Sequence, residues 1–243
     1  MELFDPIKRS QEIENLVMEG TAKRYYRFRF ATFYRSDMRK GIITADGVGC
    51  NLLCGYCWNL SRNLQPSVGR FYEPAKVAEK LVHLSEKEKN ANADLYRISG
   101  CEPFLGEASA RHLVAIVDAF ERKEKPAGFM IESNGIMLGA MPELCNMLHG
   151  LDVHVRIAVK ADSPERFEMI TGAKGDAWRY QEIAVNELNK RNISCSVAIM
   201  PQFVNPLKIK FRGTIPDQLE QEQLKKYPQT VKQMKARGLV VGP

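Results

Sequence analysis

The fold of this chain is decided around one stretch, which runs Gly41-Ile-Ile-Thr-Ala45-Asp46-Gly-Val-Gly-Cys50-Asn-Leu-Leu-Cys54-Gly-Tyr-Cys57-Trp-Asn59. It begins with a short apolar segment of the kind that forms a buried parallel strand. It then passes directly into a loop in which three cysteines are spaced C-x3-C-x2-C. Because active sites of α/β folds lie at the carboxyl ends of the strands, this loop is a candidate site.

Downstream of this stretch, short apolar runs alternate with amphipathic segments. The runs that we expect to be strands, the first included, are Gly41–Ala45, Asp94–Ser99, Gly128–Glu132, Val153–Val159 and Ile193–Met200. The expected helices between them are Pro74–Leu84, Glu107–Lys123, Pro142–Leu148, Pro164–Thr171 and Trp178–Lys190. This alternation predicts an α/β fold with a parallel sheet or barrel inside and helices outside.

Two extensions flank the alternating part, so we divide the chain into residues 1–40, 41–205 and 206–243. The first holds a predicted helix over Pro6–Met18 and a basic, aromatic segment over Lys23–Arg39. Arginines among aromatic rings could stack on nucleic-acid bases, or the rings could be the buried half of an amphipathic element. The last extension holds a polar helix predicted over Pro216–Lys235 and a short strand over Leu239–Val241.

The composition is that of a soluble globular protein of 243 residues, with 44% apolar and 26% charged residues. No apolar run approaches the roughly 20 residues that span a bilayer, and the charged Met1–Asn15 segment lacks a signal-peptide core, so we expect a cytoplasmic protein without a membrane partner. The net charge of +6 permits an anionic partner, although scattered basic residues also suit a solvated surface.

The cysteine spacing suits an iron–sulfur cluster better than a disulfide framework or a structural zinc ion. Three thiolates on one tight loop can hold a single [4Fe-4S] cubane and leave one iron open for a substrate or cofactor. Structural zinc needs four protein ligands, and the next candidates, His83 and Cys101, lie far along the chain. Cys101, Cys145 and Cys195 stand alone, as small buried hydrophobic residues do.

The motif, with Tyr56 as the aromatic residue before its third cysteine, resembles that of the radical S-adenosylmethionine (SAM) superfamily. The resemblance covers about Gly41 to Gln202 and is closest to the small branch of activating enzymes for glycyl-radical enzymes. It implies a partial (β/α)6 barrel similar to a TIM barrel. It also implies that the open iron binds SAM, which is cleaved reductively to a 5′-deoxyadenosyl radical that abstracts hydrogen from a substrate. Without a second group of cysteines, we expect no further cluster.

Two later segments carry the resemblance further. Ser99-Gly100-Cys101-Glu102-Pro103 resembles the G-G-E-P segment that meets the SAM amino group, with Cys101 in place of its second glycine. Ile131-Glu132-Ser133-Asn134-Gly135 resembles the T-N-G segment near the SAM ribose and carboxylate. Gly100, Glu102, Ser133 and Asn134 are therefore candidate SAM contacts, with a surface carboxylate and a plain tight turn as the alternatives.

Residues 156–160 at the end of the fourth strand, with residues 162–165 and 170–172 after it, resemble the stretch of the activating enzymes that contains their D-x-K and T-G segments. Ala158 replaces the aspartate of that pattern. A cation within an apolar strand is costly unless it is paired, so Arg156 and Lys160 could bind a SAM carboxylate or an acid of the core. Met200 ends the fifth strand where the family packs the adenine, or it is simply a core residue.

These features predict a radical SAM enzyme, expected to be a monomer, that takes electrons from flavodoxin or ferredoxin. Its substrate could be a protein, an RNA or a small molecule. Installation of a glycyl radical on a partner enzyme is one alternative; Ala158 and the basic, aromatic segment favour direct modification of a metabolite, peptide or RNA base. An iron–sulfur electron carrier or sensor without catalytic activity is an alternative of another class.

Overall fold

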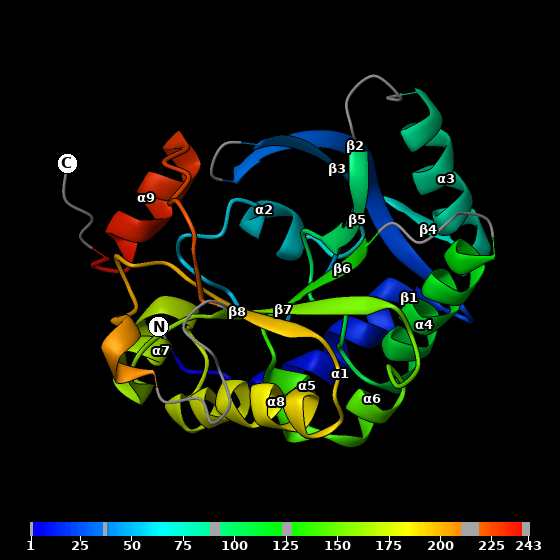
Figure 1. The fold of residues 1–243 in the computed structure, drawn as a ribbon. Coiled ribbons are helices and arrows are strands. Elements are labelled where there is room, and N and C mark those ends of the chain that lie inside the picture. The colour runs from blue at the N-terminus through cyan, green and yellow to red at the C-terminus, as the bar shows by residue number, and fades with distance from the viewer. Residues whose placement is uncertain (1, 36–37, 88–92, 123–127, 210–218, 240–243) are drawn as a thin grey trace.

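The structure, a computed structural model, describes residues 2–35, 38–87, 93–122, 128–209 and 219–239. Within these ranges, nine strands form one sheet in the order β1-β2-β3-β5-β6-β7-β8-β9, with β4 paired to β2 (Figure 1). The strands are β1 (Met18–Glu19), β2 (Ala22–Arg35), β3 (Met38–Gly47), β4 (Arg70–Tyr72), β5 (Ala93–Ser99), β6 (Gly128–Ser133), β7 (Val153–Val159), β8 (Cys195–Ile199) and β9 (Leu219–Gln221).

Six neighbouring strands, β3 and β5 to β9, run parallel to one another. The sheet curves but stays open, because β9 ends one side of the strand order and β1 ends the other. This arrangement confirms the predicted partial (β/α)6 barrel, to which β1, β2 and β4 add an antiparallel edge. All six parallel strands point their carboxyl ends to the same edge, and the cysteine loop follows the first of them.

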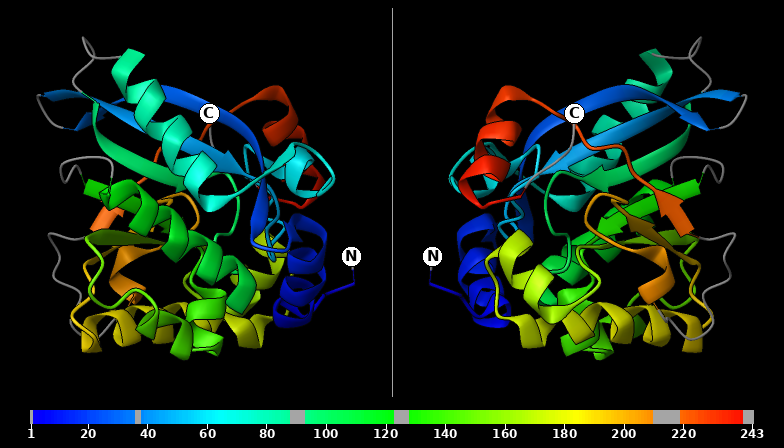
Figure 2. Two further views of the ribbon diagram at one scale, coloured as in Figure 1. Left: turned by 90° about the vertical axis from the view of Figure 1, so that its right-hand side faces the viewer. Right: turned by 90° about the vertical axis from the view of Figure 1, so that its left-hand side faces the viewer.

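Helices cover the outer face of the curved sheet (Figures 1 and 2). Two of them begin on side-chain caps: Asp5 caps the first helix through Ile7 and Lys8, and Ser163 caps α7, which ends at Gly172 in the left-handed region. The described helices are α1 (Pro6–Val17), α2 (Leu60–Asn63), α3 (Pro74–Lys87), α4 (Glu107–Glu121), α5 (Ile136–Ala140), α6 (Glu143–Asn146), α7 (Pro164–Thr171), α8 (Arg179–Lys190) and α9 (Pro228–Ala236), with 3-10 turns at Gly175–Trp178 and Pro206–Lys208. Every helix in the described ranges is too short or too polar to cross a membrane.

The two faces of the sheet differ in character. Side chains that face the helices, such as Ile43, Ile131 and Val155, are fully buried and apolar, and they form the main core with the inner sides of the helices. The opposite, inward face carries polar side chains, among them Thr44 and Arg156. Because side chains alternate across a strand, apolar and polar faces follow from the same sequence runs.

The structure departs from the sequence predictions at several places, and the short elements β1, α2 and β4 were also not predicted. The polar helix predicted over Pro216–Lys235 is wrong at residues 219–221, which form β9, and the helix is confined to α9. The basic, aromatic segment forms the long strand β2, for which we predicted no strand. The short helix α5, over Ile136–Ala140, was not predicted either. The ends of three predictions, at Lys123, Pro216 and Val240–Val241, lie outside the described residues.

Candidate functional site

Backbone hydrogen bonds hold the cysteine loop to two other segments of the chain. Leu53 and Gly55 donate their backbone N–H groups to the carbonyls of Thr171 and Ile170 at the end of α7, over 3.1 and 2.9 Å. On the other side, Val48 donates to the carbonyl of Arg24 in β2 over 3.2 Å. The loop that carries the three thiols is therefore fixed to a helix end and to the antiparallel edge.

The three thiols occupy one buried environment. Cys54 is buried, and Cys50 and Cys57 are partly exposed. Burial raises the pKa of all three thiols, that of Cys57 to about 11. After burial, Glu102 and then Cys54 raise the pKa of Cys50, and Cys54 raises that of Cys57, whereas Lys160 lowers the pKa of Cys54 and Cys57. The three sulfurs are thus close enough to interact electrostatically, and Lys160 is the cation near those of Cys54 and Cys57.

This donor set fits a cluster bound through three thiolates. Thiolates are the form that binds iron, and a cation nearby favours them. Beside Cys50, the buried Nδ2 of Asn51 has no hydrogen-bond partner among the described residues, so a donor is left for a ligand there. Among those residues, no three His, Cys, Asp or Glu side chains are grouped to hold a single metal ion.

The loop after β5 reaches the cysteine loop through Gly100. Gly100 has a φ of +77°, and a Cβ at this position would lie 3.2 Å from the Cβ of Asp46. Its carbonyl accepts a hydrogen bond from the side chain of Asn59. Cys101, the departure from the family pattern, is accommodated because it faces Gly47, where a Cβ would lie only 2.5 Å from its Sγ.

Glu102 joins the loop after β5 to the loop after β6. Its carboxylate is 1% exposed and accepts hydrogen bonds from the hydroxyl of Ser133 and the N–H of Asn134, both at 2.7 Å, and from the N–H of Phe104 at 3.1 Å. Burial raises the pKa of Glu102, and these donors act against burial. The alternative of a surface carboxylate is wrong for this residue.

Asn134 extends the same connection to the cysteines. Its side-chain amide donates to Oδ1 of Asn51 over 2.7 Å and approaches Sγ of Cys50 at 3.7 Å. Its carbonyl accepts from Nε2 of Gln181 over 2.6 Å. The structure therefore brings together the residues predicted from all three loops, through Glu102 and Asn134.

The two predicted cations of β7 differ in their surroundings. The guanidinium of Arg156 contacts Glu220 over 2.9 Å, Glu222 over 2.7 Å and Glu132 over 3.7 Å. It is therefore paired with acids of the chain itself, as in the alternative to a SAM carboxylate, although these acids are only partly buried. Lys160 lies after β7 and is partly exposed near Cys54 and Cys57. Of these two residues, Lys160 is the one left near the thiols.

Tyr56 and Met200 lie close to the cysteine loop but at its apolar side. The ring of Tyr56 is buried and stacks on Phe203, with centroids 4.9 Å apart. Met200 is a partly buried member of the main core, and its carbonyl accepts the N–H groups of Phe203 and Val204. Phe203 thereby packs the segment after β8 against Tyr56, the residue before Cys57.

Sequence reasoning missed two residues that hold these loops in place. Lys23 of β2 is 2% exposed, and its ammonium donates to the carbonyls of Glu102 over 3.1 Å and Pro103 over 3.4 Å. Gln181 is 1% exposed and joins Asn134, Ala158 and Lys160. The signal for Gln181 was a polar residue on the apolar face of a predicted helix; for Lys23 we find none.

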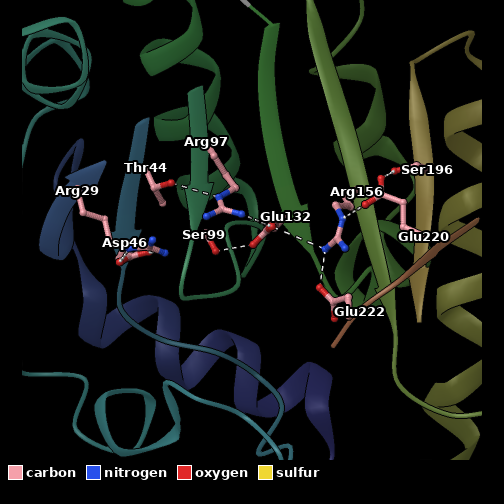
Figure 3. A network of polar contacts seen from close by, with 10 residues as sticks. All are labelled: Arg29, Thr44, Asp46, Arg97, Ser99, Glu132, Arg156, Ser196, Glu220 and Glu222. Atoms are coloured by element: carbon pink, nitrogen blue, oxygen red, sulfur yellow. Dashed lines mark hydrogen bonds and ion pairs between the residues drawn. The ribbon is translucent and has the colours of Figure 1, made fainter. Parts of the chain in front are cut away.

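A chain of polar contacts crosses the inward face of the sheet next to these loops (Figure 3). Arg97 contacts Thr44 and Glu132, Ser99 also contacts Glu132, and Arg156 continues the chain to β9. Burial, the largest single effect, raises the pKa of Glu132, but Arg97, Arg156 and the hydroxyl of Ser99 outweigh it and hold that pKa below its ordinary 4.5. The wall beside the candidate site is therefore charged and polar.

Comparison with known protein families gives one match. Residues 45–205 match the family model of the radical SAM superfamily, which is two thirds of the chain. A comparison with curated protein sequences finds no match.

Solved structures with a similar arrangement of elements include TYW1 with a lysine-pyruvate adduct bound, at 17% identity and a TM-score of 0.43, with 65% of this chain and 54% of that chain covered. Another is SuiB of Streptococcus suis bound to S-adenosylmethionine, at 18% identity and a TM-score of 0.45, with 63% and 32% covered. A radical SAM methyltransferase from Sphaerobacter thermophilus matches at 11% identity and a TM-score of 0.43, with 86% and 67% covered. The chain thus spans about half of TYW1 and a third of SuiB.

Proposed function

The chain belongs to the radical SAM superfamily, and we propose that it is an enzyme holding a [4Fe-4S] cluster on Cys50, Cys54 and Cys57, with SAM beside it. When bound, the cluster and SAM supply a one-electron cleavage that gives methionine and a 5′-deoxyadenosyl radical for hydrogen abstraction. The single observation that carries the proposal is the joining of three loops at the cysteines, where Glu102 binds Ser133 and Asn134, and Asn134 reaches Asn51 and Cys50.

The residues of this chain would divide the work of binding. Glu102 fixes Ser133 and Asn134, so the loop that they form would meet SAM in a fixed geometry. Lys160, near two of the thiols, supplies a positive charge for the SAM carboxylate. Arg156, engaged by three glutamates, shapes the inner wall.

The polar inner wall supports a polar substrate. Arg97, Glu132 and Arg156 line it with both signs of charge, and Ser196 and His154 add further hydrogen-bonding groups. An apolar substrate would displace water from these charged and polar groups, which is costly. We therefore propose hydrogen abstraction from a substrate that carries charged or hydrogen-bonding groups.

The test of the proposed function is anaerobic reconstitution of the wild-type chain with iron and sulfide. We expect a broad absorbance near about 400 nm and, with dithionite and SAM, formation of 5′-deoxyadenosine and methionine. Calorimetry should detect SAM binding by the reconstituted protein, which a plain electron carrier would not show. A reconstituted protein that binds no SAM, or gives no 5′-deoxyadenosine, would exclude this function.

The substitution Glu102→Gln is expected to weaken SAM binding by about tenfold and to lower the free energy of unfolding by about 2 kcal/mol. The carboxylate now accepts hydrogen bonds from Phe104, Ser133 and Asn134. In the variant, the side-chain N–H₂ group would face at least one of these donors, which would then be buried without an acceptor. Calorimetric titration of SAM and urea unfolding measure the two effects.

The matched control is Glu107→Gln, an exposed glutamate at the start of α4 that pairs with Arg111. It should change neither quantity measurably, because exposed pairs contribute little. SAM affinity that is unchanged in Glu102→Gln would show that the carboxylate does not organise the binding loops.

A further inference from the structure

Arginines and aromatic rings form a patch beside the cysteine loop, which we call the arginine–aromatic patch. Its members are Arg27 and Arg29 of β2, Arg62 of α2, and the rings of Tyr26 and Trp58. The proposed function does not use it.

The rings hold the guanidinium groups in place. Arg27 lies 5.3 Å from the centre of the Tyr26 ring and 5.8 Å from that of Trp58. Arg62 lies 4.6 Å from the Tyr26 ring, and Arg29 lies 5.8 Å from the Trp58 ring. A guanidinium stacked on a ring keeps N–H groups at its edge for a carboxylate. The patch is thus ordered before any partner binds.

The patch carries more positive charge than its own acid neutralises. Asp46 is fully buried and accepts from Arg27 over 2.7 Å and from Arg29 over 2.6 Å, so one carboxylate serves two arginines. The Arg62 guanidinium lies over a ring instead. The Arg27 side chain remains 44% exposed, and Leu64, at the end of α2, exposes 54% of its surface. Arginine and aromatic side chains that remain partly exposed are enriched in protein interfaces.

The patch also adjoins the proposed cluster ligands. Trp58 directly follows Cys57, and Asn63, next to Arg62 in α2, accepts a hydrogen bond over 3.1 Å from the N–H of Gly49, the residue before Cys50. A protein seated here would lie one residue from a cysteine of the loop. Electron transfer between proteins needs such proximity but only a small, weak interface.

We propose that the arginine–aromatic patch is the docking surface of an acidic electron-carrier protein. The inference rests on the proposed function, since the carrier loses one electron and the cysteine-held cluster gains it. Charge complementarity would steer a negatively charged carrier to this side of the molecule and make its binding sensitive to salt.

Single-stranded RNA is the other anionic partner to consider, and the geometry favours it less. Base stacking needs free ring faces. Tyr26 already carries two guanidinium groups, and so does Trp58. The rings therefore serve to hold arginines rather than to receive bases.

The test measures binding of a flavodoxin, as the probe, to the cluster-loaded enzyme by calorimetry at about 50 mM and about 300 mM sodium chloride. The double variant Arg27→Gln/Arg62→Gln should bind about tenfold more weakly than wild type at low salt and show a smaller salt dependence. Asp46 keeps Arg29 as its partner in this variant, so the buried carboxylate stays paired. The control Lys76→Gln/Arg111→Gln removes the same charge from α3 and α4 and should bind like wild type.

SAM cleavage driven by dithionite should be the same in both double variants, because this small reductant needs no docking surface. The docking proposal would be overturned if the patch variant bound flavodoxin as tightly as wild type, or if wild type did not bind it. The proposed function would still stand in that case, provided that dithionite drives SAM cleavage. Tighter binding of a uridine 20-mer than of flavodoxin, lost in the patch variant, would overturn the docking proposal in favour of RNA. Absence of dithionite-driven cleavage in wild type would instead count against the proposed function.

Discussion

Alanine in place of Cys50, Cys54 or Cys57 is expected to leave the chain without an iron–sulfur cluster, whereas alanine in place of Cys101, Cys145 or Cys195 should leave the cluster in place. Each of the first three would remove one of three thiolate ligands, and two thiolates on one loop do not retain a cubane. Cys145 and Cys195 are buried in the core, and Cys101 faces Gly47. Iron and sulfide content after anaerobic reconstitution measures the difference.

The second trio is the matched control, since all six variants lose one thiol. We expect about four irons per chain for wild type and the controls, and near none for the loop variants, which should also form no 5′-deoxyadenosine. Circular dichroism separates loss of the cluster from loss of the fold. Loss of iron in Cys101→Ala would show that the thiol next to Glu102 is a ligand and that our assignment is wrong.

The sequence predicted the parallel part of the fold because its signals are local. The apolar runs at Val153–Val159 and Ile193–Met200 coincide with β7 and β8 within a few residues. Parallel strands also place their carboxyl ends at one edge, so the meeting of Cys50, Glu102 and Asn134 followed from their positions after three such runs. The family match over residues 45–205 confirms the superfamily that the cysteine motif indicated.

The parts that the sequence did not predict depend on contacts between distant segments. β9 is three residues long, two of them polar, and it is a strand because it pairs with Val197–Ile199 of β8. Its glutamate, Glu220, meets Arg156 from 64 residues away. Propensity favoured a helix there, and tertiary pairing overrode it. Lys23 likewise reaches Glu102 across 79 residues, which no local pattern reports.

The alternation in β2 was readable in principle. Arg27 and Arg29 point to Asp46 on one face of the strand. The rings of Tyr25 and Phe28 lie on the other face, where they stack on each other. A shift in register between Tyr25 and Arg27 interrupts the simple period of two. The irregularity, rather than the composition, kept this segment from being recognised as a strand.

The substitution Arg156→Met is expected to lower the free energy of unfolding by about 3 kcal/mol at neutral pH. Arg156 is 8% exposed and contacts Glu132, Glu220 and Glu222, so its removal leaves three carboxylates near one another without their shared cation. Glu132 keeps Arg97 as a partner. Because Glu220 and Glu222 are about one third exposed, water screens part of the cost.

The pH dependence of this loss distinguishes charge from packing. The folded protein holds the pKa of Glu132 below its ordinary 4.5, so the ionised carboxylate contributes stability above that value and loses it as the pH falls through the lower, folded pKa. Arg156→Met weakens that contribution. The difference between variant and wild type should therefore be largest near about pH 7 and shrink below about pH 4, as urea unfolding at both values would show.

Arg156→Lys is the companion variant, because it keeps a positive charge but cannot make the forked contacts to Glu220 and Glu222, and it should lose less stability than Arg156→Met. Arg111→Met, at an exposed pair on α4, is the control for loss of an arginine and should cost little at either pH. An equal loss in Arg156→Met at both pH values would mean that the arginine stabilises the fold by filling space rather than by pairing with ionised carboxylates. The inner wall would then owe its order to packing, and the charged chain from Arg97 to β9 would be its consequence.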